Sequence, residues 1–450
     1  MINQKETITA ISTPIGEGAI SIVRLSGKNS IAIINKIFSK DILNFKDKTA
    51  YIGKILDSKK NVVDEVILTL FKTPNSFTGE DIVEIACHGG ILITQRVFEE
   101  VLNAGARPSG PGEFTMRAFL NKKIDLSQAE AIQDLISAKN KFALKAASNQ
   151  LCGHLSKEIK KFQKLLIDIA AIMEVSLDFP EEGIDDAETK SLIDDMLSIL
   201  KSMQELSDTF EDGKIIKAGV SICIAGSVNV GKSSLMNAIL KKDRAIVTSI
   251  SGTTRDVLKE DIKLNDMFYQ LIDTAGIRKT TCTIEQEGIK RSRREQKNSD
   301  ITLLVLDASK KLSEDDLTFI KILNRKKTIA IWNKIDISDP QEKIDFENVV
   351  KISAKNRIGL ENLYKMIEKI TFKSKISNDE IFITNKRHKY ALDGAISYLK
   401  KALIDLGKGI SFEFITIDIK SSLKELSKIL GFDITEDILS SIFSNFCIGK

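Results

Sequence analysis

The chain has 450 residues and a mass of 50.0 kDa, enough for about three domains at roughly 150 residues each. Its composition is ordinary for a globular protein, with 42% hydrophobic residues, 28% charged residues and 6 prolines. The net charge of +4 is too small to indicate nucleic-acid binding by itself.

The five cysteines argue against a disulfide framework and against a zinc site, because they are scattered, odd in number and form no CxxC pair. They favour a reducing compartment. The first residues contain no apolar signal segment, and no apolar run reaches 18 residues. We therefore expect a cytoplasmic protein without a membrane partner. The cysteines are Cys87, Cys152, Cys223, Cys282 and Cys447.

Residues 1–120 predict a small α+β domain. Short β-rich runs such as "AISIVRL", "VILTLF" and "DIVEIAC" alternate with Gly/Pro loops, and "ILITQRVFEEVLNAGA" reads as a helix. From 121 to 217 apolar residues recur at three- and four-residue spacing, which predicts long amphipathic helices broken at "FPEEGID".

Residues 218–375 predict a parallel sheet. Four runs, "GVSICIAG", "ITLLVLDAS", "TIAIWNKID" and "NVVKISAK", each precede a loop and a helical stretch, as in βα units. A hairpin is expected to turn at Asn265–Asp266. Helices resume over 376–450. The simplest account is an α/β domain inserted into a discontinuous all-α domain, whose parts 121–217 and 376–450 rejoin in space.

The run "GSVNVGKSS" (226–234) follows an apolar strand and precedes a helix, which is the context of a P-loop. Glycines let backbone N–H groups turn around phosphates, and Lys232 adds a cation at the β/γ oxygens. The Ser233 hydroxyl can ligate Mg²⁺. The alternative interpretation is a glycine turn that occurs by chance, and the further nucleotide-binding motifs argue against it.

Further motifs indicate GTP rather than ATP. "DTAG" (273–276) ends a strand, where Asp273 can reach Mg²⁺ and Gly276 can sense the γ-phosphate. In "NKID" (333–336) the Asp336 carboxylate can accept two N–H bonds from guanine, and "SAK" (353–355) would back the base. The inserted domain is therefore predicted to be a Ras-like α/β P-loop GTPase.

The loop "SGTTRD" (251–256) is positioned to supply a second Mg²⁺ hydroxyl, for which we prefer Thr254 to Thr253, although an ordinary Ser/Thr-rich loop is the alternative. Ras-like proteins orient the attacking water with a glutamine soon after the DTAG glycine, and none is present here. Glu285 either orients the water or is a solvated helix residue. A monovalent cation held by Asn229 could replace an arginine finger.

The whole chain resembles the MnmE (TrmE) family of tRNA-modification GTPases. The resemblance rests on "PNSFTGEDIVEIACHGG", on "ARPSGPGEFTMRAFLNKKIDLSQAEAIQDLISA", on the inserted G domain and on "FCIGK" (446–450). It covers essentially all residues in order, and these blocks are far more specific than the P-loop alone.

The resemblance implies an N-terminal domain that dimerises and binds a formyl- or methylene-tetrahydrofolate. It also implies a heterotetramer with the flavoprotein MnmG (GidA), which would carry the FAD. Together they would add an aminomethyl-type (carboxymethylaminomethyl) group to C5 of the wobble uridine, position 34, of certain tRNAs. GTP hydrolysis would need Mg²⁺ and be stimulated by K⁺, which drives the two G domains together.

The resemblance also assigns roles to residues of this sequence. Glu285 becomes the water-orienting residue, and Lys232 acts with it in catalysis. Mg²⁺ would be held by Ser233 and Thr254, and K⁺ by Asn229, Thr248, Ile250 and Thr253. Folate would meet Arg24, Glu84, Lys123 and Lys450. The residues expected at the GTP site are Asn229, Val230, Gly231, Lys232, Ser233, Ser234, Thr248, Ser249, Ile250, Ser251, Gly252, Thr253, Thr254, Asp273, Thr274, Ala275, Gly276, Asn333, Lys334, Asp336, Ser353, Ala354 and Lys355.

Some assignments stay open. Val228 stands where the family usually has proline, and the choice of Lys123 over Lys122 depends on register. Cys447 is either catalytic or a packing residue. The basic run 290–297 is either a solvated helix face or a contact with tRNA or the partner. The alternative function is a regulatory G-protein switch that binds ribosomes or rRNA without modification chemistry.

Overall fold

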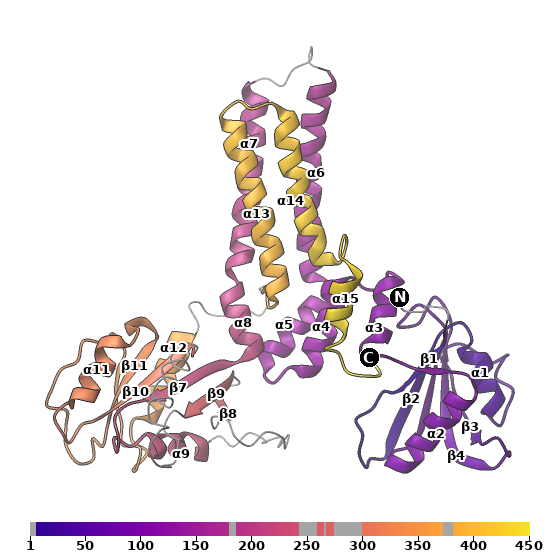
Figure 1. The fold of residues 1–450 in the computed structure, drawn as a ribbon, viewed down its shortest axis with the longest axis horizontal. Coiled ribbons are helices and arrows are strands. Elements are labelled where there is room, and N and C mark those ends of the chain that lie inside the picture. The colour runs from indigo at the N-terminus through magenta and orange to yellow at the C-terminus, as the bar shows by residue number, and fades with distance from the viewer. Residues whose placement is uncertain (1–5, 180–185, 243–258, 265–266, 274–298, 372–380) are drawn as a thin grey trace. The chain divides into compact units, whose positions relative to one another are not determined.

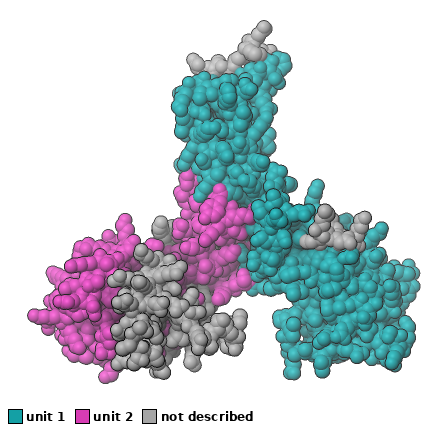
Figure 2. Space-filling model, viewed as in Figure 1, with its two compact units in different colours: residues 1–136, 148–201, 391–450 teal, residues 137–147, 202–390 magenta. Residues whose placement is uncertain are grey.

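The computed structural model describes residues 6–179, 186–242, 259–264, 267–273, 299–371 and 381–450. Contacts divide the chain into two compact units (Figure 2). Unit 1 comprises residues 1–136, 148–201 and 391–450, and unit 2 comprises residues 137–147 and 202–390. The domain limits expected from the sequence, at 120, 217 and 375, differ from the boundaries of these two units and stay a proposal. Among the described helices, none combines the length and apolarity needed to cross a membrane.

The N-terminal part of unit 1 is built on a six-stranded sheet of order β3-β4-β5-β2-β1-β6 (Figure 1). Helices α1 and α2 cover one face, where inward-pointing strand residues such as Leu68 and Ile85 pack against Ile34 and Val97. The elements are β1 (Ile8–Ile11), β2 (Ile20–Ser26), α1 (Ser30–Ile37), β3 (Ala50–Leu56), β4 (Val62–Phe71), β5 (Ile82–His88), α2 (Ile91–Asn103) and β6 (Arg107–Pro108). This confirms the expected α+β character.

The other face of this sheet carries an apolar row across four strands. Ile52 pairs with Ile67, Ile67 with Ala86, and Ala86 with Ile22, so alternate side chains share one face. The exposed fractions of Ile52 and Ile67 are 62% and 44%. We call these four residues the apolar row.

The helical part contains both halves of the discontinuous domain. Helix α6 packs along α14, and Gln163 donates to Ser427 between them. Ser422 of α14 donates to the Ala395 carbonyl of α13, which joins the next pair of helices. The helices of unit 1 are α4 (Leu126–Ser137), α6 (His154–Asp178), α14 (Phe412–Leu430) and α15 (Glu436–Phe443), with the larger parts of α7 (Asp186–Asp208) and α13 (Lys386–Gly407). Helix α8 (Phe210–Ala218) and the first part of α5 (Lys141–Leu151) belong to unit 2. The expected reunion of two distant helical segments is thereby confirmed.

The C-terminal segment packs on helix α3 (Glu113–Leu120). Phe443 and Phe446 join one buried cluster with Met116 and Leu126. At Gly112, φ is +64°, and an added Cβ would lie 2.8 Å from the Cβ of Phe446. Only glycine therefore lets the tail approach the start of α3 so closely.

Unit 2 contains a second six-stranded sheet, of order β12-β11-β10-β7-β9-β8. Its strands are parallel except for β8, which pairs antiparallel with β9 as the expected hairpin. Every residue of β10 is buried, as expected for a strand covered on both faces. The elements are β7 (Val220–Ala225), α9 (Lys232–Lys242), β8 (Lys259–Leu264), β9 (Met267–Asp273), β10 (Ile301–Asp307), α11 (Glu314–Ile322), the 3₁₀ turn η2 (Arg325–Lys327), β11 (Thr328–Asn333), β12 (Val349–Lys351) and α12 (Leu360–Thr371).

Candidate functional site

The P-loop connects the central strand β7 to the start of α9. Gly226 and Gly231 have φ values of +144° and +101°, and Asn229 between them has a φ of +62°. An added Cβ would lie 2.3 Å from the Val305 carbonyl at Gly226 and 2.3 Å from Asn333 Nδ2 at Gly231. The loop therefore needs its glycines for close approach, and it curls as a phosphate-binding loop does before a helix N-terminus.

Lys232 and Ser233 occupy the first turn of α9. The Lys232 ammonium donates to the Gly226 carbonyl at 2.7 Å and the Ser227 carbonyl at 2.6 Å, so it lies across the loop. Ser233 is exposed at the same end of the helix. A cation over the loop and an accessible hydroxyl are what a metal-bound polyphosphate requires.

Asn333, at the end of β11, ties the P-loop to the segment expected to back the base. Its Nδ2 donates to the Val230 carbonyl at 2.9 Å, and its Oδ1 accepts from the Ala354 N–H at 3.0 Å. The side chain is buried. One amide thus joins two of the predicted motifs, while Asp336 lies exposed in the turn that follows.

Asp307, at the end of β10, is a site residue that the sequence reasoning missed. Its carboxylate lies 2.6 Å from the Lys334 ammonium, which also donates to the Asn229 carbonyl at 2.9 Å. Burial alone would raise the pKa of Asp307, but hydrogen bonds from Lys334 and Ser309 lower it below the usual value. A polar residue ending an otherwise apolar parallel strand, as Asn333 also does, was the signal that could have found it.

Several predicted site residues lie outside the described part of the chain, so their geometry stays a prediction. Asp273 ends β9 beside Ile224 of β7, but only its backbone position is described. The residues outside the described ranges are Thr248, Ser249, Ile250, Ser251, Gly252, Thr253, Thr254, Thr274, Ala275, Gly276 and Glu285.

A second group of predicted residues lies in unit 1. Arg24 and Glu84 are directly opposite on neighbouring strands β2 and β5, and Arg24 Nη2 lies 2.7 Å from Glu84 Oε1. The Arg24 guanidinium also lies 5.9 Å from the ring centroid of Phe114, on α3. The pair is half-buried, and it lies in the cross-strand row next to the apolar row.

Lys123 and Lys450 approach the same domain from two directions. Lys123 Nζ donates to the Pro74 carbonyl at 3.0 Å. The tail is held by Ser12 Oγ, which donates to the Gly449 carbonyl at 3.3 Å, and by the Gly112 N–H, which donates to the Cys447 carbonyl at 3.3 Å. Within the described residues the Lys450 ammonium makes no hydrogen bond or ion pair, so none joins it to Arg24.

Comparison with known proteins covers the whole chain. The MnmE helical-domain family matches residues 126–447, and the family described as the GTP-binding protein TrmE N-terminus matches residues 7–123. Proteins named tRNA modification GTPase MnmE are similar along their full length. Those from Protochlamydia amoebophila, Alkaliphilus oremlandii and Clostridioides difficile are 50%, 42% and 42% identical. The alignments cover 99% of this chain and 98%, 99% and 99% of the three relatives.

The Asp307 bridge predicts a selective loss of nucleotide binding. Asp307→Ala removes the carboxylate that holds Lys334 at the Asn229 carbonyl, and we expect GDP affinity to fall about tenfold, because charge-assisted bonds contribute roughly 1.5–3 kcal/mol. Fluorescent-GDP titration measures the change. The control is Asp339→Ala, which breaks the exposed Lys351–Asp339 pair and should change affinity less than about twofold. Equal losses in both variants would contradict the assignment.

Proposed function

We propose a specific activity for this chain, which belongs to the MnmE family of tRNA-modification GTPases and is therefore a GTP-hydrolysing enzyme of tRNA modification. It adds an aminomethyl-type group to C5 of the wobble uridine of certain tRNAs. The one-carbon unit comes from folate, a flavin-dependent partner takes part, and the reaction occurs in the cytoplasm. The observation that carries the proposal is the presence in one chain of a P-loop, in unit 2, and of a tail docked on the Arg24-bearing domain, in unit 1.

In the G domain the predicted site residues would divide the work of binding and hydrolysis. Lys232, which lies across the P-loop, would meet the β/γ-phosphate oxygens. Asn333 holds the P-loop against the base-backing segment. Asp336 accepts N–H bonds from guanine. Ser233 and Thr254 would hold Mg²⁺, which neutralises phosphate charge when bound. Glu285 would orient the attacking water.

The potassium proposal rests on Asn229. Its side chain is exposed, its backbone is left-handed, and its carbonyl is held by Lys334. The amide oxygen is therefore available at the rim of the P-loop, where a monovalent cation would offset charge on the β–γ bridge. Thr248, Ile250 and Thr253 would complete this site. Cation binding there is proposed to draw two G domains together.

The cation and the glutamate can be tested together. GTP hydrolysis should be faster in KCl than in NaCl at equal ionic strength, and equal rates would contradict the potassium proposal.

Glu285→Ala should leave GTP binding intact and lower turnover by about 10²-fold or more, because it removes the residue that orients the water. Glu287→Ala, two residues along, is the matched control and should retain turnover. Single-turnover hydrolysis and nucleotide titration separate the two effects.

The folate proposal rests on the Arg24–Glu84 pair and on the two lysines. Glu84 can accept N–H bonds from a pterin ring, as Asp336 would from guanine. Lys123 and Lys450 can meet the carboxylates of a folate glutamate tail. The docked tail supports this reading, because Gly449 is held at Ser12, directly after β1, and β1 pairs with the Arg24-bearing strand.

Deletion of residues 447–450 tests the tail. It should abolish the modified wobble uridine in tRNA, measured by mass spectrometry in a strain that depends on the variant, because Lys450 and the Gly449 contact are lost. GTP hydrolysis by the purified variant should persist. Cys447→Ser separates the thiol from the rest of the tail. Unchanged tRNA in a strain that lacks the whole protein would instead favour a regulatory G-protein switch.

Homodimerisation through the N-terminal sheet is supported by the apolar row. Ile52 and Ile67 expose apolar side chains on the sheet face beside the Arg24–Glu84 pair. A second copy of the chain packed on this face would remove these side chains from water. The homodimer would then associate with the flavoprotein MnmG (GidA) as a heterotetramer and with tRNA.

Ile67→Glu tests the dimer. A carboxylate on the apolar row would be desolvated at the interface, so sedimentation equilibrium should show a monomer where the unaltered protein is a dimer. Leu92→Glu, on an exposed position of α2, is the control and should leave the dimer intact. A dimer that persists in Ile67→Glu would exclude this face.

A further inference from the structure

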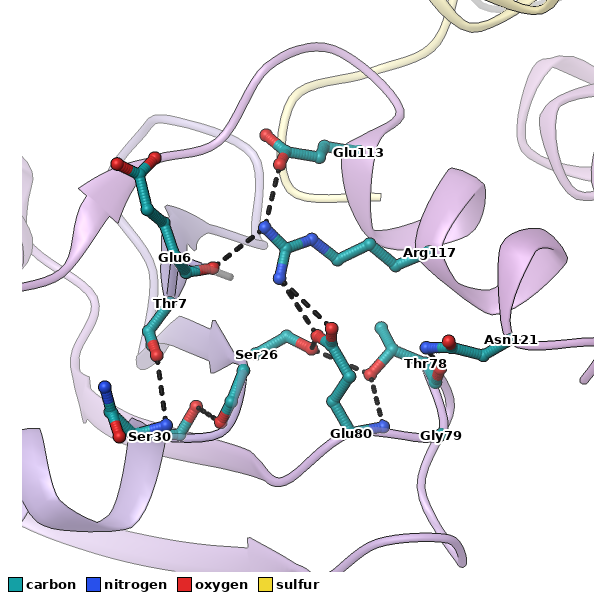
Figure 3. Close-up of polar contacts among 12 residues, drawn as sticks. Glu6, Thr7, Ser26, Ser30, Thr78, Gly79, Glu80, Glu113, Arg117 and Asn121 are labelled. Carbon is teal, nitrogen blue, oxygen red and sulfur yellow. Dashed lines mark hydrogen bonds and ion pairs between the residues drawn. The ribbon is translucent and has the colours of Figure 1, made fainter. Parts of the chain in front are cut away.

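Arg117 of α3 lies at the centre of a buried polar network whose residues have no assigned role in GTP or folate binding (Figure 3). Only 1% of its side chain is exposed. Its Nη2 donates to Glu113 Oε1 at 3.0 Å and to the Glu6 carbonyl at 2.9 Å, and its Nη1 donates to Glu80 Oε2 at 3.1 Å. The guanidinium therefore joins α3, the start of β1 and the loop before β5.

A second arginine keeps the network charged. Arg107 lies 2.7 Å from Glu113 Oε1 and 2.8 Å from Glu6 Oε2. Burial alone would raise the pKa of Glu113, but hydrogen bonds from Arg107, the Gly110 N–H and Arg117 lower it, so the carboxylate stays ionised at neutral pH. Buried ion pairs contribute little net stability relative to apolar packing. We therefore attribute to this network a role in fixing the geometry of the segments that it joins.

The network fixes the loop of residues 73–81. Glu80 Oε2 accepts from Ser26 Oγ at 2.7 Å, and Ser26 Oγ lies 2.7 Å from Thr78 Oγ1. Asn121, directly after α3, donates through Nδ2 to the Thr78 carbonyl at 2.7 Å. Arg117 and Asn121 thus hold the loop from one helix, and Ser26 holds it from β2.

The same loop contacts Lys123, which follows α3. The Pro74 carbonyl accepts from Lys123 Nζ, and a Cβ added at Gly79 would lie 3.3 Å from Lys123 Cγ, so the lysine stem lies along the loop. At the other end of α3, Gly112 seats the tail, and Phe114 lies beneath Arg24. One helix therefore contacts, directly or through the loop, the elements that present Arg24, Lys123 and Lys450.

We propose that Asn121 and Arg117 are positioning residues of the folate site: they fix loop 73–81 so that Lys123 is presented to the bound folate. This inference rests on the proposed folate-binding function. Neither residue touches the ligand. Their effect is to reduce the number of positions that the Lys123 ammonium samples before binding, which lowers the ordering cost of the complex.

Asn121→Ala is the principal test, because Asn121 is exposed and its loss removes one bond to the Thr78 carbonyl without opening the buried network. We expect the affinity for 5-formyltetrahydrofolate, measured by calorimetry on the full chain, to fall about fivefold, in line with one lost hydrogen bond that orders the site. Thermal unfolding should shift only by the small amount expected from one lost hydrogen bond, and GTP hydrolysis should not change. Gln95→Ala, which removes an exposed amide bond to Glu99 on α2, should leave folate affinity unchanged.

A double-mutant cycle with Lys123→Ala separates positioning from general loosening. If Asn121 acts through Lys123, Asn121→Ala should have no further effect on folate affinity in the Lys123→Ala background. Equal losses in both backgrounds, or no loss in either, would overturn the inference. Arg117→Lys, which retains a charge but cannot bridge three acceptors, should show the same coupling. An unaltered protein that does not bind 5-formyltetrahydrofolate would instead refute the proposed folate site itself.

Discussion

The docking of the C-terminal segment onto helix α3 is the contact on which the arrangement of unit 1 depends. Ser12 and Gly449 are 437 positions apart in the chain, yet they share a hydrogen bond, and the Phe443–Phe446 pair packs on the start of α3. Buried aromatic contacts and backbone-directed hydrogen bonds hold these two distant parts of the chain together. The second helical segment also packs on the first, through α14 and α6.

In unit 2 the corresponding constraint is the alignment of strand ends. β7, β10 and β11 are parallel neighbours, so the P-loop, Asp307 and Asn333 all follow the same edge of the sheet. Short polar side chains then join them, through Asn333 to Val230 and through Lys334 to Asp307 and Asn229. The parts of the site are therefore bonded to each other as well as attached to the strands.

The two candidate sites share a principle although their chemistry differs. In each, a backbone loop is held by side chains from a neighbouring element: Asn333 and Lys334 hold the P-loop, and Arg117 and Asn121 hold loop 73–81. In each, glycines allow an approach that a Cβ would block, as at Gly231 and Gly112. Ligand-binding groups on loops become well positioned in this way at modest cost in conformational entropy.

Much of this protein could be predicted from its sequence. The P-loop, the NKID motif and the βα pattern depend on local spacing, so they can be recognised without knowing which segments meet. The helical periodicity on both sides of the G domain likewise indicated a discontinuous domain, and the packing of α6 on α14 confirms it. The residues of loop 248–254 and Glu285 stay predictions, since they lie outside the described ranges.

Other features depended on the tertiary structure. Asp307 looks like any strand-ending carboxylate until the parallel register brings it to Lys334. Arg117 reads as one face of a short helix, and only folding surrounds it with Glu113, Glu80 and the Glu6 carbonyl. Local sequence determines which residues can bend around a phosphate or start a helix, because both depend on the backbone dihedral angles of adjacent residues. Which distant charges meet, and which loop they hold, is decided by packing, because such contacts form only when strands and helices from separate parts of the chain are brought together.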